Sequence, residues 1–126
     1  MNRFMAALEG CRVDPSMDMA VIAATLYGCD VTQLDDPAYI EQTIQEAVRA
    51  GGFTLIHCYV HQFSPQGVTG SAVLAESHIA LHSWPEYGTL FVDVATCSGM
   101  DRTRAAFDLI CKRFAPSRIE NVKTTK

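Results

Sequence analysis

Residues 68–96 read VTGSAVLAESHIALHSWPEYGTLFVDVAT, and this segment contains three short runs of strand-forming residues in series. The runs cover roughly 68–75, 78–83 and 89–96, and the turn-forming residues Trp84–Gly88 separate the second run from the third. Strands that follow one another with only short turns between them pair as hairpins. The segment therefore predicts an antiparallel meander.

The segments on either side of the meander contain further strand candidates. Residues 19–27 form a nearly continuous apolar run that ends at a Gly-Cys-Asp turn, which is typical of a buried strand. Residues 53–63 are rich in β-branched and aromatic types and are followed by the turn sequence Ser-Pro-Gln-Gly. Residues 118–122 form a shorter candidate for a last strand.

A helix is predicted between the strand at 19–27 and the strand at 53–63. Asp36 and Pro37 supply an N-cap and a first-turn proline, and Gly51–Gly52 closes the segment. Its apolar residues recur at intervals of four, at Ile40, Ile44 and Val48.

A second helix is predicted after the meander, where Asp101 is expected to cap the start and Pro116 to stop the end. The side chains expected to face the core are Phe107, Ile110, Cys111 and Phe114. The resulting order is strand, helix, four strands, helix, strand. This order predicts an α+β two-layer sandwich, with one antiparallel sheet and two helices on one face.

The length of the chain, 126 residues, supports a single domain, which we place at 19–126. Residues 1–18 have no clear period and are expected to form an N-terminal arm. The net charge of −4 argues against binding to nucleic acid, and no apolar run approaches the length of a membrane span. Five cysteines without a CxxC pair, and no recognisable signal peptide, favour the cytoplasm.

The four histidines form two pairs with i, i+4 spacing, His57 with His61 and His78 with His82. On a helix this spacing would suit a metal site. In a strand the two side chains are about 13 Å apart, so we expect no metal site. We expect His57 and His61 to be half-buried, hydrogen-bonded residues of their strand.

The meander also contains a dense motif. It reads ESH at Glu76–His78, HSWPE at His82–Glu86, then Gly88, Asp93 and Cys97. This pattern resembles the signature of the small prokaryotic S-adenosylmethionine decarboxylases, ESH-x3-H-[ST]-WPE-x-G followed by D-x3-C. LYGCD at 26–30 and QFSPQGVTG at 62–70 extend the resemblance over most of the chain from residue 19 onward.

The resemblance implies a chain that cleaves itself between Glu76 and Ser77, giving a β chain of residues 1–76 and an α chain of residues 77–126. Ser77 would attack the carbonyl of Glu76, and elimination and hydrolysis would leave a pyruvoyl group made from Ser77. That ketone would form a Schiff base with the substrate and accept the electrons released with CO2, without pyridoxal phosphate or a metal.

The resemblance also implies roles for five other residues. His82 would transfer protons during processing, Cys97 would return a proton to the substrate, and Thr69 stands where the family usually has a processing serine. Phe63 would stack on the adenine of the substrate, and Glu86 would accept hydrogen bonds from its ribose.

Strand geometry adds an argument about assembly. A turn at Trp84–Gly88 places Cys97 beside Ala75, at the same end of the sheet as Ser77. His82, however, lies about 16 Å along the strand from Ser77. The family builds its sites across a homodimer interface, so we expect Ser77 and Cys97 from one subunit to meet four residues of the other. Those four are Phe63, Thr69, His82 and Glu86.

Two departures from the family pattern leave the substrate open. Residues 19–22 and Thr25 replace a segment with a histidine and an acidic residue, and Thr69 replaces a serine. A basic amino acid such as ornithine or arginine is the alternative substrate, because Glu86 would suit its cationic side chain as well as a ribose. S-adenosylmethionine is favoured because Phe63 and Glu86 together match a nucleoside. A non-catalytic homologue that acts as a partner subunit is the third hypothesis.

Overall fold

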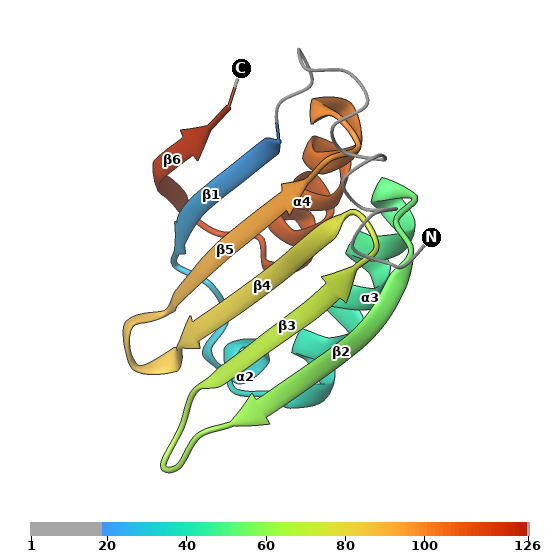
Figure 1. Cartoon of the computed structure of the whole chain (residues 1–126). Helices are drawn as coiled ribbons and strands as arrows, with labels where there is room; N and C mark the ends of the chain where they lie inside the picture. The colour runs from blue at the N-terminus through green and yellow to red at the C-terminus, as the bar shows by residue number, and fades with distance from the viewer. Residues whose placement is uncertain (1–18, 126) are drawn as a thin grey trace.

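Six strands form one antiparallel sheet in the order β2-β3-β4-β5-β1-β6 in the computed structural model, which describes residues 19–125 (Figure 1). The strands are β1 (Ala20–Tyr27), β2 (Leu55–Gln62), β3 (Val68–Leu74), β4 (Ser77–Trp84), β5 (Thr89–Thr96) and β6 (Arg118–Thr124). The predicted meander corresponds to β3, β4 and β5. The arm expected at 1–18 lies outside the described residues.

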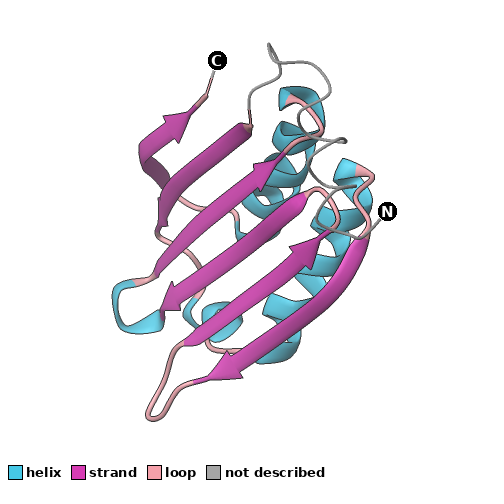
Figure 2. Ribbon diagram, in the orientation of Figure 1, coloured by secondary structure: helices cyan, strands magenta, loops and turns pink. Residues whose placement is uncertain are grey.

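Two long helices, α3 (Pro37–Gly51) and α4 (Met100–Phe114), pack against each other on one face of the sheet (Figure 2). The α+β two-layer sandwich predicted from the sequence is therefore confirmed. Two short elements were not predicted, the single-turn helix α2 (Val31–Leu34) and the 3-10 helix η1 (Pro85–Tyr87). No helix within residues 19–125 is long and apolar enough to cross a bilayer.

The end signals of α3 act as predicted. The Asp36 carboxylate accepts a hydrogen bond from the backbone N–H of Ala38 at 2.9 Å, and Pro37 occupies the first helical position. Gly52 ends the helix in the left-handed conformation, with φ of +67°. Local residues therefore fix both ends of this helix.

The start of α4 differs from the prediction. Gly99 is the N-cap and the helix begins at Met100, so Asp101 lies in the first turn and does not cap it. The hydroxyl of Thr103 donates to the Gly99 carbonyl at 2.9 Å. Asp101 is still favourable at this end, because a carboxylate interacts well with the positive end of the helix dipole.

The core lies between the helices and the inner face of the sheet. Alternate residues of β1, β3, β4 and β5 are buried, as expected for strands covered on one side. Gly70 of β3 gives α3 room to approach, because a Cβ there would lie 2.7 Å from Ile44 Cδ1 and 2.8 Å from Ile40 Cγ2. Cys111, which was expected in the core, is only partly buried.

Within residues 19–125, no helix covers the opposite face of the sheet (Figure 1). We call it the open face. The alternation of buried residues along the strands and the pairing register place on it Tyr59, Thr69, Val73, His78, Ala80, His82, Phe91 and Asp93. Most of the residues predicted to have chemical roles belong to this face or border it.

Candidate active site

The predicted site residues fall into two groups at opposite ends of β4. The first, which we call the cleavage group, consists of Glu76, Ser77 and Cys97. The second, the pocket group, consists of Phe63, Thr69, His82 and Glu86. His82 is five positions along the strand from Ser77, about 16 Å in an extended chain. One chain therefore keeps the two groups apart.

Ser77 has an unusual backbone at the hairpin between β3 and β4. Its φ is +143°, a conformation that residues with a side chain rarely adopt. Such a conformation costs about 1–3 kcal/mol and persists only where the surroundings enforce it. The peptide that the sequence identifies as the cleavage site is thus next to a strained residue.

The register between β4 and β5 corrects one prediction by a single residue. Ser77 pairs with Thr96 and Trp84 with Thr89, because η1 and Gly88 form the turn. Cys97 therefore lies opposite Glu76 and not beside Ala75, as the sequence had suggested. The backbone N–H of Cys97 donates to the Glu76 carbonyl oxygen at 3.0 Å. This hydrogen bond polarises the carbonyl that Ser77 would attack.

The side chain of Glu76 is held away from that carbonyl. Its carboxylate accepts hydrogen bonds from the backbone N–H of Thr54 at 2.9 Å and from the Thr54 hydroxyl at 3.3 Å. Thr54 immediately precedes β2, so this contact ties the hairpin to the neighbouring strand. It fixes the residue on the N-terminal side of the strained peptide.

Two residues without a predicted role complete this end of the sheet. His78 Nδ1 lies 3.4 Å from Ser77 Oγ, and His78 Nε2 lies 3.1 Å from Asp93 Oδ2. Asp93 pairs with Ala80, so His78 and Asp93 are diagonal neighbours on the open face. Both are in the sequence motif, but their contact depends on the register and could not be inferred from spacing alone.

The pocket group lines a single hollow of about 310 Å³ at the other end of β4. Its walls are Phe63, Gln66, Gly67, Thr69, His82, Ser83, Trp84 and Glu86. The structure thus brings together the four residues that the sequence assigned to one half of a shared site. Gln66 and Trp84 are wall residues to which the sequence assigned no role.

His82 is well anchored within this hollow. Its Nδ1 lies 3.2 Å from the hydroxyl of Thr69, directly across the β3–β4 ladder. The rings of Trp84 and Phe91 lie 6.4 Å and 6.0 Å from its own. Phe63, at the rim, is 50% exposed and available for contact with a flat ring.

The loop that presents Phe63 is tied to the start of the first long helix. The Phe63 N–H donates to the Gly67 carbonyl at 2.8 Å, and the Gly67 N–H donates to the Asp35 carboxylate at 2.9 Å. The side-chain amide of Gln62 donates to the Asp35 carbonyl at 3.1 Å. These hydrogen bonds therefore hold the rim of the hollow in a fixed position relative to α3.

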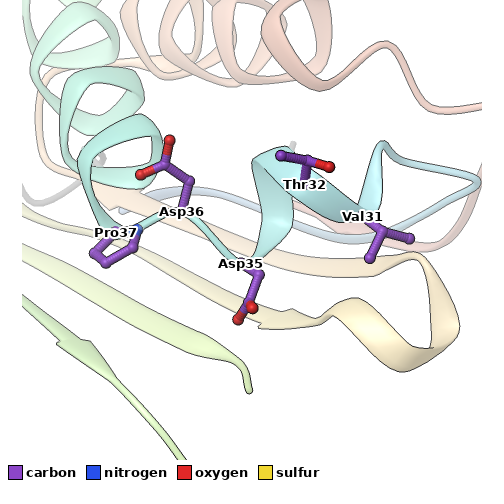
Figure 3. A pocket seen from close by; sticks show the side chains of 5 residues that line it. All are labelled: Val31, Thr32, Asp35, Asp36 and Pro37. Atoms are coloured by element: carbon purple, nitrogen blue, oxygen red, sulfur yellow. The ribbon is translucent and has the colours of Figure 1, made fainter. Parts of the chain in front are cut away.

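A larger hollow of about 420 Å³ lies against α2 and the start of α3 (Figure 3). Its lining consists of Val31, Thr32, Asp35, Asp36 and Pro37. None of these is a predicted site residue. Both carboxylates have structural partners, since Asp35 holds the Gly67 N–H and Asp36 caps α3. We therefore place the candidate site at the smaller hollow.

Among the described residues, the remaining cysteines and histidines form no second centre. Burial raises the pKa of Cys29 and of Cys111 to about 11 and also raises the pKa of Cys58, so these thiols stay protonated near neutral pH. His57 and His61 are exposed on the edge strand β2, which corrects the expectation that they are half-buried. Within residues 19–125 no three metal-binding side chains cluster.

Comparison with known proteins gives one family. The family model for S-adenosylmethionine decarboxylase matches residues 20–126. A protein of Synechococcus sp. WH7803 named S-adenosylmethionine decarboxylase proenzyme is 54% identical over 72 residues, 57% of this chain and 56% of that protein. The match to this relative therefore spans little more than half of its length.

Two other matches extend further. A proenzyme of the same name from Methanococcus maripaludis strain C7 is 46% identical over 99 residues, 79% of this chain and 81% of that protein. The crystal structure of the adenosylmethionine decarboxylase from Aquifex aeolicus VF5 has a TM-score of 0.81 and 36% identity. The structural match covers 85% of this chain and 88% of the Aquifex chain.

Proposed function

Since the chain belongs to the S-adenosylmethionine decarboxylase family, we propose that it is a self-processing enzyme that removes CO2 from S-adenosylmethionine. The product would be an aminopropyl donor for spermidine synthesis. The observation that carries the proposal is the strained Ser77 hairpin, in which the Cys97 N–H binds the Glu76 carbonyl. The name shared by the relatives favours S-adenosylmethionine over a basic amino acid.

Self-processing would proceed at the bond between Glu76 and Ser77. The Ser77 hydroxyl oxygen attacks the Glu76 carbonyl carbon, the C–N bond breaks, and the peptide becomes an ester with a free amine on Ser77. Loss of the Ser77 α-proton expels the Glu76 carboxylate, and water then replaces the resulting imine nitrogen, which leaves as ammonia. The products are chains 1–76 and 77–126.

The residues around Ser77 suit a pyruvoyl cofactor, because the hydroxyl side chain that follows the turn of this hairpin, Ser77, would become the group itself. Once formed, the pyruvoyl ketone supplies an electron sink for decarboxylation. The role proposed for Cys97 is to return a proton to the substrate α-carbon, and its position opposite Glu76 supports this. The chain needs no pyridoxal phosphate or metal in this scheme.

The pocket group would bind the nucleoside. Phe63 presents a half-exposed ring for adenine, and Glu86 lies on the same hollow, where its carboxylate accepts hydrogen bonds from the ribose hydroxyls. Thr69 and His82 face each other across the ladder and would move protons during processing.

We further propose a homodimer with two shared active sites. The cleavage group and the pocket group lie at opposite ends of β4, so neither forms a complete site alone. A two-fold axis perpendicular to β4 would place one end of the strand next to the other end of its copy. The open face exposes Tyr59, Val73 and Trp84, which supports its burial against a second copy. A cytoplasmic location stays a prediction from the scattered cysteines.

Intact-mass spectrometry on freshly purified protein tests the proposal. Two species are expected, about 8 kDa and about 5.5 kDa in proportion to the cleaved lengths of the 13.8 kDa chain. The smaller one should be about 17 Da lighter than simple hydrolysis predicts, and borohydride should add about 2 Da to it. A single 13.8 kDa species would contradict self-processing and favour a non-catalytic homologue.

A further inference from the structure

Three side chains at the proposed cleavage bond form a relay. Ser77 Oγ lies 3.4 Å from His78 Nδ1, and His78 Nε2 lies 3.1 Å from Asp93 Oδ2. The first distance is long for a hydrogen bond, as is common between a nucleophile and its base before the reaction geometry tightens. Hydroxyl, imidazole and carboxylate therefore lie in the order used to activate a serine.

The carboxylate sets the protonation pattern of the imidazole. An ionised carboxylate only accepts hydrogen bonds, so Nε2 of the neutral ring carries the proton that points to Asp93. Nδ1 is then left with its lone pair, and it is this nitrogen that faces Ser77 Oγ. The side chains of His78 and Asp93 are 42% and 32% exposed, so the relay is only partly covered in one chain.

Within the same chain, His82 does not lie beside Ser77. It is about 16 Å further along β4, and its Nδ1 faces the hydroxyl of Thr69. His82 can reach Ser77 only from a second copy of the chain, whereas His78 is beside Ser77 in every copy.

We propose that His78 is the base for the first step of self-cleavage and that Asp93 positions it; the assignment rests on the self-processing proposed above. The Ser77 hydroxyl gives its proton to His78 Nδ1 as the oxygen bonds to the Glu76 carbonyl carbon. The Cys97 N–H stabilises the oxyanion that forms. When the C–N bond breaks, the imidazolium returns the proton to the Ser77 nitrogen, and the ester and the neutral imidazole remain.

The test compares variants of the two histidines by the rate at which the intact chain disappears. His78→Ala and His78→Gln should slow cleavage by about 10²–10⁴-fold, the usual contribution of a general base. The chain that accumulates should still have the amide bond, so it should resist hydroxylamine, which cleaves esters. Added imidazole should speed cleavage of His78→Ala, where it fits the space of the missing ring, and should have no effect on His78→Gln.

Controls separate this inference from a general loss of fold. His57→Ala removes an exposed histidine from the same face and should cleave like the wild type. Circular dichroism and thermal melting should match Ser77→Ala, which keeps the fold without the nucleophile. For Asp93, Asp93→Asn should slow cleavage by more than about 10-fold because the wrong tautomer forms, and Asp93→Glu should recover part of the rate.

Three outcomes would overturn the assignment. One is a His78→Ala chain that cleaves at the wild-type rate, which would leave the proposed function intact. Another is a His78→Ala or His78→Gln chain that is cut by hydroxylamine, because the ester would then form without His78. The third is a wild-type chain that never cleaves, which would overturn self-processing itself.

Discussion

At the scale of single residues, Ser77 shows why a strained position is kept. Glycine would occupy a φ of +143° at lower cost, but it has no hydroxyl to attack the Glu76 carbonyl. In the proposed self-processing, replacing the peptide bond at Ser77 with an ester would release this strain, which would favour the first step of the reaction. A conformational penalty of about 1–3 kcal/mol would thus favour breaking the proposed cleavage bond.

A prediction at this scale concerns Glu86 and the choice of substrate. Glu86→Gln weakens hydrogen bonds to the ribose, because an amide has only one acceptor oxygen where the carboxylate has two. A loss of about 1.5 kcal/mol corresponds to a KM for S-adenosylmethionine that is about 10-fold higher, with kcat little changed. Steady-state kinetics with S-adenosylmethionine, ornithine and arginine measures this.

The matched control is Glu41→Gln, on an exposed site of α3, which should leave KM unchanged. If Glu86 recognises a cationic side chain, the wild type will turn over ornithine or arginine and not S-adenosylmethionine. That result would contradict the nucleoside role of Glu86 and of Phe63.

At the scale of elements, the packing of β3 against α3 depends on one position without a side chain. Gly70→Ala would bring a Cβ within 2.8 Å of the Ile40 Cγ2 atom, which is fixed to the helix by a short branch. Overpacking of this kind costs about 1–3 kcal/mol of unfolding free energy. Urea denaturation should show a lower midpoint with an unchanged slope.

Ser71→Ala is the control for this change, since Ser71 is the next residue of β3 and is exposed on the other face. It should alter the free energy of unfolding by less than about 0.5 kcal/mol. An equal loss in both variants would mean that β3 tolerates no substitution, and the close approach of α3 would not be the cause.

The elements were predictable where local signals agree with burial. Asp36, Pro37 and Gly52 fix the ends of α3 without help from distant residues. Buried and exposed residues alternate along a strand such as β3 because the helices cover only one face of the sheet. The start of α4 differs from the prediction because Gly99 is an N-cap without a capping side chain, and Asp101 lies in the first turn, where it marks the start of the helix without capping it.

The site was predictable in composition but not in its contacts. The motif supplied the residues proposed for both groups, and the register of the β4–β5 hairpin decides which of them touch. A 3-10 turn at η1 moves the pairing by one residue, and this puts Cys97 opposite Glu76. The contact of His78 with Asp93 follows from that same register. The spacing of His78 and Asp93 along the sequence does not show that they touch.

At the scale of the whole molecule, the separation of the two groups is itself an argument for assembly. The cleavage group contains the proposed nucleophile and the carbonyl that accepts the Cys97 N–H, whereas the pocket group lines the hollow proposed for the nucleoside. The open face, which no helix of residues 19–125 covers, supplies a surface on which two copies can meet in opposite directions. Each copy would then complete the other.

The last prediction follows from this arrangement and concerns mixed dimers. A Ser77→Ala chain retains His82, and a His82→Ala chain retains Ser77 and Cys97. When the two are co-expressed, each mixed dimer has one site with all its wild-type groups and one with neither Ser77 nor His82. Random pairing makes half of the dimers mixed, so activity should return to about a quarter of the wild-type level. Only the His82→Ala chain should be cleaved and carry the pyruvoyl group, which different affinity tags and mass spectrometry will show.

The control pair is Ser77→Ala with Cys97→Ala, both in the cleavage group. If that group comes from one subunit, no active site of a mixed dimer contains both Ser77 and Cys97, so no decarboxylase activity should return. Recovery in the first pair and none in the second would mean that Ser77 and Cys97 of one subunit act with His82 of the other, as the geometry of β4 implies. Recovery in both pairs, or in neither, would contradict it, because each site would then be assembled from a different division of the residues or within one chain.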